Sequence, residues 1–195
     1  MLIKDAEAVE LMEKVDTLVI DKTGTLTEGK PSVQVVVAAP GFDAAQVPRW
    51  AASLEASSEH PLAAAIIEHA RNDGLALVDV SDFSAVGGQG ARGVIDGGEM
   101  RPGNAQLLAA ANVEPGLFDA AVNALRQQGQ TVMYLSSGKL LAGYVGVADA
   151  IKASTLEAIR QLKASGLRIV MLTGDNPLTA EAVGRRLGWT KSGPV

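Results

Sequence analysis

The spacing of apolar residues changes along this chain, and the changes divide it into three stretches. Short runs rich in β-branched residues predict strands, whereas apolar residues spaced three and four apart predict helices. The first stretch has helical spacing over residues 6–14, a strand pattern over residues 17–20 and a turn at residues 28–31. It therefore predicts a helix that leads into a buried strand, and that strand ends directly before Asp21.

The middle stretch mixes helices with strands that glycines separate. The predicted strands cover residues 33–39, 81–86, 91–96, 99–101, 131–136 and 140–147, and the predicted helices cover residues 44–56, 61–73, 105–111 and 115–128. The strands follow one another around short turns, which is typical of an antiparallel sheet. This stretch predicts an α+β unit of about a hundred residues, a usual domain size.

The last stretch returns to an alternation of helix and strand. It predicts a helix over residues 151–164 that Gly166 ends, a strand over residues 167–172, and a helix over residues 177–187. Helices that alternate with strands indicate a parallel sheet. We interpret the chain as an α/β domain, residues 1–28 and 148–195, interrupted by an inserted α+β domain, residues 29–147.

Composition and charge exclude several classes of function. Among the 195 residues, 47% are hydrophobic and 20% are charged, which is typical of a globular protein. The net charge of -5 and the absence of a basic run give no reason to expect nucleic acid as a partner. No cysteine is present, so disulfides and thiolate metal sites are excluded. The longest apolar runs, such as residues 140–148, are far shorter than the roughly 20 residues that span a bilayer, and the first residues do not resemble a signal peptide.

Asp21 is the strongest candidate for chemistry, because it directly follows a buried strand. Ligands of open α/β sheets bind outside the carboxyl ends of the strands. A carboxylate there can attack a phosphorus atom and form an aspartyl phosphate, provided that a metal ion offsets the repulsion between two anions. The alternative is a surface turn, since Asp, Gly and Thr commonly form turns after strands.

The sequence Asp-Lys-Thr-Gly-Thr-Leu-Thr at residues 21–27 resembles the phosphorylation motif of P-type ATPases, ion pumps that pass through a phosphoaspartate. The resemblance implies that ATP phosphorylates Asp21, that Lys22 and Thr23 line the phosphate site, and that Asp21 and Thr23 bind Mg²⁺. Related haloacid dehalogenase-like hydrolases have a second Asp, a general acid and base, at the position of Thr23. Because a hydroxyl is a poor proton acceptor at neutral pH, the phosphoenzyme should be long-lived.

A second motif, Ser-Glu-His-Pro-Leu at residues 58–62, resembles the Ser-Glu-His-Pro motif of heavy-metal-transporting P-type ATPases. The resemblance implies that His60 lies against the adenine of ATP and that Glu55 recognises its exocyclic amine. Without the resemblance, His60 would be a helix cap or a surface residue, and Glu55 would be an ordinary solvated residue.

Two glycine motifs complete the adenosine pocket that this resemblance implies. Gly88 and Gly90 correspond to a Gly-x-Gly that flanks the adenosine, and Gly103 and Asn104 correspond to a downstream Gly-Asn pair. Glycines let the backbone approach a ligand closely. From the residues alone, the first motif is equally a hairpin turn and the second a helix start.

The loop after the last predicted strand resembles the Thr-Gly-Asp motif of the same family. Thr173 and Gly174 would then lie near the transferred phosphate, and Asp175 would lie near the nucleotide, with a helix cap as the alternative for Asp175. Residues 149–152 resemble the hinge that returns the chain from the nucleotide domain, with Ala150 where the family usually has Pro.

These motifs predict a truncated haloacid dehalogenase-like, Rossmannoid phosphorylation domain with an inserted nucleotide-binding domain built on an antiparallel sheet. The family's later Lys and its Gly-Asp-Gly-x-Asn-Asp loop do not occur in the sequence, so the phosphorylation domain is expected to be incomplete. The expected function is the cytosolic catalytic part of an ATP-driven heavy-metal pump in the cell membrane, with ATP and Mg²⁺ as cofactors. Its expected partners are the pump's transmembrane and actuator domains, and the transported ion is not expected to bind this part.

Three alternatives remain open at this point. The isolated chain is expected to turn over ATP very slowly or not at all, and the missing Lys and acidic Mg²⁺ ligand favour the alternative that it binds ATP without phosphorylating itself. It could also be a small-molecule phosphatase, although Thr23 and the nucleotide motifs argue against a phosphatase. Residues 12–31 most resemble copper pumps, with zinc and cadmium pumps as the alternatives for the transported metal.

Overall fold

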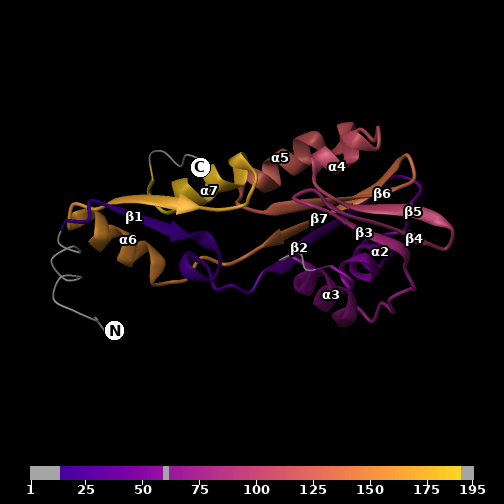
Figure 1. The fold of residues 1–195 in the computed structure, drawn as a ribbon, viewed down its shortest axis with the longest axis horizontal. Coiled ribbons are helices and arrows are strands. Elements are labelled where there is room, and N and C mark those ends of the chain that lie inside the picture. The colour runs from indigo at the N-terminus through magenta and orange to yellow at the C-terminus, as the bar shows by residue number, and fades with distance from the viewer. Residues whose placement is uncertain (1–13, 59–61, 190–195) are drawn as a thin grey trace.

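The computed structural model describes residues 14–58 and 62–189, and their strands form two sheets of opposite kind (Figure 1). A two-stranded parallel sheet lies at one end of an elongated molecule, and a six-stranded antiparallel sheet lies at the other. The six-stranded sheet has the order β2-β7-β6-β5-β4-β3, with bounds Ser32–Ala38 (β2), Leu140–Ala148 (β7), Thr131–Ser137 (β6), Gly98–Gly103 (β5), Gly90–Ile95 (β4) and Ser81–Val86 (β3). The predicted fold class is confirmed.

The parallel sheet consists of β1 (Thr17–Asp21) and β8 (Arg168–Leu172), which come from opposite ends of the sequence. Their register runs from Thr17 opposite Arg168 to Asp21 opposite Leu172, so both strands end at the same edge. Helices α6 (Thr155–Ala164) and α7 (Pro177–Arg186) flank the two strands in Figure 1. A buried apolar cluster holds these elements together: Leu26, Ile159, Met171, Ala180, Val183, Leu187 and Trp189.

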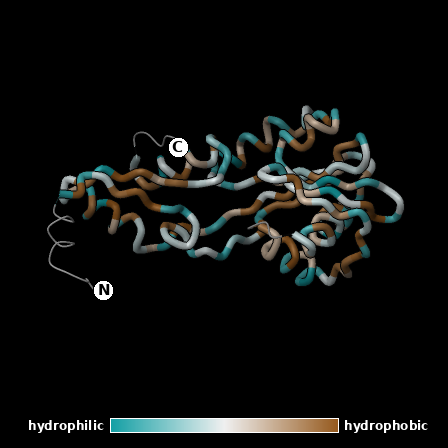
Figure 2. Tube along the Cα trace, in the orientation of Figure 1, coloured by the Kyte–Doolittle hydropathy of each residue, from teal (hydrophilic) through white to brown (hydrophobic). Residues whose placement is uncertain are grey.

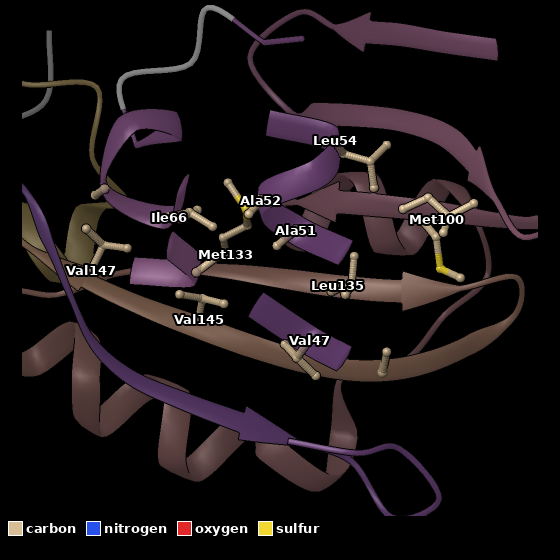
Figure 3. Close-up of a cluster of buried hydrophobic side chains, with 14 residues drawn as sticks. Val47, Ala51, Ala52, Leu54, Ile66, Met100, Met133, Leu135, Val145 and Val147 are labelled. Atoms are coloured by element: carbon tan, nitrogen blue, oxygen red, sulfur yellow. The ribbon is translucent and has the colours of Figure 1, made fainter. Parts of the chain in front are cut away.

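The antiparallel sheet has helices on both faces. Helices α2 (Gln46–Glu55) and α3 (Ala63–Asn72) cover one face, and α4 (Ala105–Ala110) and α5 (Asp119–Gln127) cover the other. Met133 and Leu135 of β6 belong to the cluster under α2 and α3 (Figure 3), whereas Val132 and Tyr134 belong to the cluster under α4 and α5. Because both faces are covered, β6 and β7 each contain a run of consecutive buried residues. Hydrophobic and hydrophilic segments alternate along the chain in Figure 2.

Two predicted helices begin later than the sequence pattern indicated. The helix predicted over residues 151–164 begins at Thr155, because Ile151 instead forms an antiparallel bridge with Thr27 and the backbone N–H of Lys152 donates to Leu26 O at 3.1 Å. The segment predicted as a helix over residues 115–128 divides into a short 3-10 turn, Gly116–Phe118, and α5.

The remaining predicted strands and helices are present within three residues at each end. The helix predicted over residues 6–14 and the predicted helix start at Pro61 lie outside the described residues. No helix in the described part of the chain combines the length and the apolar character that a membrane span requires.

Gly90 marks the closest backbone approach between neighbouring strands of the large sheet. It lies opposite Gly103 across β4 and β5, with a φ of 142°. A Cβ added at Gly90 would lie 2.2 Å from the carbonyl oxygen of Pro102, and one at Gly103 would lie 2.4 Å from that of Gln89. The pairing of these strands therefore requires a glycine at both positions.

We expect Gly90→Ala to lower the free energy of unfolding by about 2–4 kcal/mol, because overpacking adds to the strain of an unfavourable φ. Gly87→Ala is the matched control in the same turn, since a Cβ there meets no atom within 4 Å. Urea denaturation of both variants measures the difference. Equal free energies of unfolding for the two variants would contradict the expectation, because they would show that β4 and β5 accommodate the added Cβ without loss of stability.

Candidate active site

Asp21 lies at the exposed end of β1, where the chain turns sharply. The turn Lys22–Leu26 is closed by a hydrogen bond from Thr27 N to Lys22 O at 3.2 Å, and Gly24 adopts a φ of 74°. The hydroxyl of the buried Thr27 also accepts a hydrogen bond from Gly24 N at 3.2 Å. The local structure therefore holds the motif's backbone in one conformation and leaves the Asp21 carboxylate accessible.

Asp175 follows β8 and joins three segments. Because Asp21 pairs with Leu172, the loop that begins at Thr173 emerges beside the turn after Asp21. The Asp175 carboxylate forms an ion pair with Lys22 Nζ, and its Oδ1 accepts a hydrogen bond from Thr131 Oγ1 at 2.9 Å. Lys22 is only 8% exposed, so this ion pair is largely shielded from water.

The alternative role of Asp175 as a helix cap is wrong. Asn176 caps α7 instead, since its Oδ1 accepts a hydrogen bond from Leu178 N at 2.9 Å. Asp175 N donates to Thr173 Oγ1 at 3.1 Å, which orders the loop. The Asp175 side chain is thus free of a capping role and faces the predicted phosphate site.

The structure brings five of the six predicted phosphate-site residues around one cavity of about 260 Å³, which we call the phosphate-site cavity. Asp21 is not among its lining residues, but it directly precedes Lys22, which is. The cavity is lined by the predicted residues Lys22, Thr23, Thr173, Gly174 and Asp175 and by Gly29, Pro31, Leu62, Gly129, Thr131, Val147 and Asp149.

Asp21 and Thr23 fit the oxygen chemistry of Mg²⁺. Both are exposed, one offering a carboxylate and the other a backbone carbonyl. No group of three or more His, Cys, Asp or Glu side chains within residues 14–58 and 62–189 could hold a metal ion. Mg²⁺ commonly takes one or two protein oxygens and completes its shell with phosphate oxygens and water.

Asp149 joins the two chain segments that connect the sheets through hydrogen bonds. Its Oδ2 accepts a hydrogen bond from Thr27 Oγ1 at 2.6 Å, and its Oδ1 accepts one from Lys30 N at 3.2 Å. Nearby, Lys152 Nζ donates to Gly24 O at 2.5 Å, and Glu28 N donates to Ala150 O at 2.8 Å. The segment that the sequence suggested as a hinge is therefore tied directly to the phosphorylation motif.

The four residues of the two glycine motifs line a second cavity of about 330 Å³, which we call the glycine-lined cavity. Asn104 caps the start of α4, which agrees with the alternative that the Gly-Asn pair is a helix start. Its Oδ1 accepts hydrogen bonds from Gln106 N at 3.0 Å and Leu107 N at 3.2 Å. Its Nδ2 also donates to Gly88 O at 2.9 Å. Asn104 thus caps a helix and fixes the β3–β4 turn at the same time.

The two cavities share part of their lining. Leu62, Thr131, Gly174 and Asp175 line both. A ligand that extends from the glycine motifs past Asp175 would therefore reach the turn after Asp21 without crossing the core.

Glu55 lies apart from both cavities, and the interpretation of it as an ordinary solvated residue is wrong. It ends α2 with 1% of its surface exposed, and its carboxylate lies close to the Ser58 side chain. Burial raises the pKa of Glu55, and the nearby Ser58 side chain lowers it by a smaller amount. His60, the predicted adenine contact, lies outside the described residues.

Several lining residues had no signal in the sequence. Thr131 begins β6 and Arg126 lies in the last turn of α5, and both line the glycine-lined cavity. Neither position belongs to a motif, and both are typical of ordinary surface polar residues. Their role in the cavities depends on which strands neighbour each other in the sheet.

Comparison with known proteins agrees with the motifs. The family model for haloacid dehalogenase-like hydrolases matches residues 15–192. The chain is 47% identical over 188 residues to a copper-transporting P-type ATPase of Rhizobium leguminosarum bv. viciae, covering 96% of this chain and 22% of that protein. It is 43% identical over 189 residues to a silver exporting P-type ATPase of Salmonella typhimurium, covering 96% of this chain and 23% of that protein. The chain thus spans less than a quarter of either relative.

Solved structures show the same fold. A zinc-transporting PIB-type ATPase in the E2.Pi state has a TM-score of 0.69 and 32% identity, over 99% of this chain and 31% of that one. The catalytic domain of the CPx-ATPase CopB-B has a TM-score of 0.71 over 99% of this chain and 66% of that one. At 24% identity, the second likeness supports the fold alone. The predicted resemblance to heavy-metal P-type ATPases is confirmed.

The buried Glu55 carboxylate should make stability depend on pH. Because its pKa is raised in the folded protein, the unfolded chain releases the proton first as the pH rises above about 4.5, and the folded state loses relative stability until the pH passes the raised pKa. We expect the stability of Glu55→Gln relative to wild type to increase by about 1 kcal/mol between pH 4 and pH 8, since the amide carries no charge.

Urea denaturation at several pH values measures this difference. Glu68→Gln, at an exposed position of α3, controls for the general loss of one negative charge. A constant difference between Glu55→Gln and wild type across the range would contradict the expectation.

Proposed function

The chain belongs to the haloacid dehalogenase-like hydrolase family, and from this membership we propose that it binds ATP and transfers the γ-phosphate to Asp21 as the catalytic part of a heavy-metal cation pump. The observation that carries the proposal is the shared lining of the two cavities. Residues that resemble an adenosine pocket line one, residues that resemble a phosphate site line the other, and Asp175 lies at both.

Residues of both cavities orient the nucleotide for this reaction. The adenosine lies against Gly88, Gly90, Gly103 and Asn104, and the triphosphate passes the Asp175 loop toward the end of β1. A carboxylate oxygen of Asp21 attacks the γ-phosphorus as the bond to the oxygen bridging the β- and γ-phosphates breaks, and ADP leaves with the electron pair. The proximity that the loops impose replaces a bimolecular encounter.

Lys22 supplies positive charge at this point. Its ammonium is already fixed by Asp175, so it needs little reorganisation to neutralise phosphate oxygens. Thr173 and Gly174 line the same cavity and offer a hydroxyl and a backbone amide. Asp21 and Thr23 would hold Mg²⁺, which when bound offsets the repulsion between the carboxylate and the phosphates.

Thr23 explains why a phosphatase is the weaker alternative. It lines the phosphate-site cavity where a general acid and base would be needed, and its hydroxyl cannot take a proton from water efficiently at neutral pH. The aspartyl phosphate is therefore expected to persist, which suits a pump and not a phosphatase.

The remaining proposals concern the parent protein. We propose residues 1–28 and 148–195 as a phosphorylation domain and residues 29–147 as a nucleotide-binding domain on the cytoplasmic side of a membrane protein, acting with transmembrane and actuator domains. Copper is the proposed transported ion, because relatives named for copper transport match across the chain. A relative named for silver and a structure named for zinc are the reason to keep other metals as alternatives.

ATP binding and phosphorylation are expected to separate in two variants. His60→Ala should weaken ATP binding about tenfold or more, because the adenine loses its stacking partner. Asp21→Asn should bind ATP as well as wild type but form no acid-stable, hydroxylamine-labile phosphoenzyme. Calorimetric titration with and without Mg²⁺ measures the first effect, and labelling with γ-phosphate-labelled ATP measures the second.

The outcomes distinguish the candidate functions. Binding without labelling of the wild-type chain would make it an ATP-binding module only. Rapid hydrolysis of a generic phosphate ester would favour the phosphatase. Failure to bind ATP, with a normal circular-dichroism melt, would overturn the assignment of the glycine-lined cavity.

A further inference from the structure

Arg126 is the only cationic side chain that lines the glycine-lined cavity within the described ranges. It lies in the last turn of α5, and none of the motifs that define the proposed function includes it. Gly129, three residues later, lines the phosphate-site cavity. The end of α5 therefore lies where the two cavities meet.

Tyr134 holds the guanidinium of Arg126 in place. The Cζ of Arg126 lies 5.8 Å from the centre of the Tyr134 ring, a cation–π geometry. Tyr134 is 1% exposed and belongs to the core under α4 and α5, so the ring is a rigid support. Arg126 is thus positioned before any ligand arrives.

The Arg126 guanidinium also interacts with the Tyr134 hydroxyl, and it keeps further N–H donors for a ligand. Its Nη1 donates to Asn123 Oδ1 at 3.4 Å, a long contact within the same helix. No carboxylate of the described residues forms an ion pair with it, in contrast to Arg101 with Glu99 and Arg160 with Glu157. A guanidinium has five N–H donors, so Arg126 retains the capacity to bind an anion in a forked geometry.

The charges around the cavity favour an anion at Arg126. Among the residues that the structure describes, Asp175 is the only carboxylate in the lining, and Lys22 and Thr131 already bind it. The protein as a whole carries a net charge of -5, which repels a nucleotide at long range. A fixed and unpaired cation inside the cavity offsets that repulsion locally.

We propose that Arg126 binds the polyphosphate of the nucleotide and guides it from the glycine motifs toward Asp21. This inference rests on the proposed function, because it takes an adenine nucleotide as the ligand of the cavity. Arg126 adds to that function a residue that distinguishes ATP and ADP from AMP and adenosine. Charge-assisted bonds from a planar guanidinium suit two adjacent phosphates better than a single one.

The test compares adenosine, AMP, ADP and ATP by calorimetry against wild type, Arg126→Gln and Arg126→Lys. We expect Arg126→Gln to weaken ATP and ADP binding about tenfold and to change AMP and adenosine binding less than twofold. Arg126→Lys should lose less, because it keeps the charge without the fork. Arg160→Gln, at an exposed ion pair on α6, is the control for the loss of one positive charge.

A purely structural role would give a different result. If Arg126 only supported Tyr134, all four ligands would weaken together and the melting temperature would fall, and that outcome would overturn the inference. Unchanged ATP binding by Arg126→Gln would overturn it too, while leaving the proposed function intact. If the wild-type chain binds none of the four ligands, the proposed function fails and the inference fails with it.

Discussion

The Asp175 carboxylate is the contact on which the arrangement of this molecule depends. It binds Lys22 after β1 and Thr131 at the start of β6, so a single side chain joins the parallel sheet to the antiparallel sheet. A shielded carboxylate is costly unless paired, and removing one partner of such a pair typically costs about 3–5 kcal/mol. The Asp175 contacts therefore tie the loop after β8 to the turn after β1 and to the start of β6, where the two cavities adjoin.

Near that contact, hydrogen bonds between residues far apart in the sequence fix the two segments that connect the sheets. Two segments of the chain connect the sheets: one leads into β2 and the other leaves β7. Asp149 directly follows β7 and accepts hydrogen bonds from the segment that leads into β2. The Lys152 ammonium holds the carbonyl of Gly24 from the same side. The turn Lys22–Leu26 is thus shaped by residues more than a hundred positions away, which makes its geometry a property of the fold and not of the motif alone.

The sequence predicted the elements well, because periodicity and turn residues are local. It could not predict that the helix after Ile151 begins at Thr155, since the preceding residues prefer backbone bonds to Leu26 and Thr27 over a first helical turn. It also missed Thr131 and Arg126, which reach the cavities only because the sheet order places β6 and α5 beside the Asp175 loop. Without the family resemblance, Glu55 would have passed as an ordinary solvated residue, but the packing of α2 buries it.

The glycines show how a packing requirement and a binding role can occupy the same residue. Gly90 and Gly103 are already required where β4 and β5 approach closely, so their presence alone would not indicate a ligand. Gly88 differs, because a Cβ there would meet nothing and only its φ of 68° favours glycine. Asn104 then links this open turn to the start of α4 through the Gly88 carbonyl. All four residues line the glycine-lined cavity, so the close pairing of β4 with β5 and the Asn104 bond to the turn both help to shape its wall.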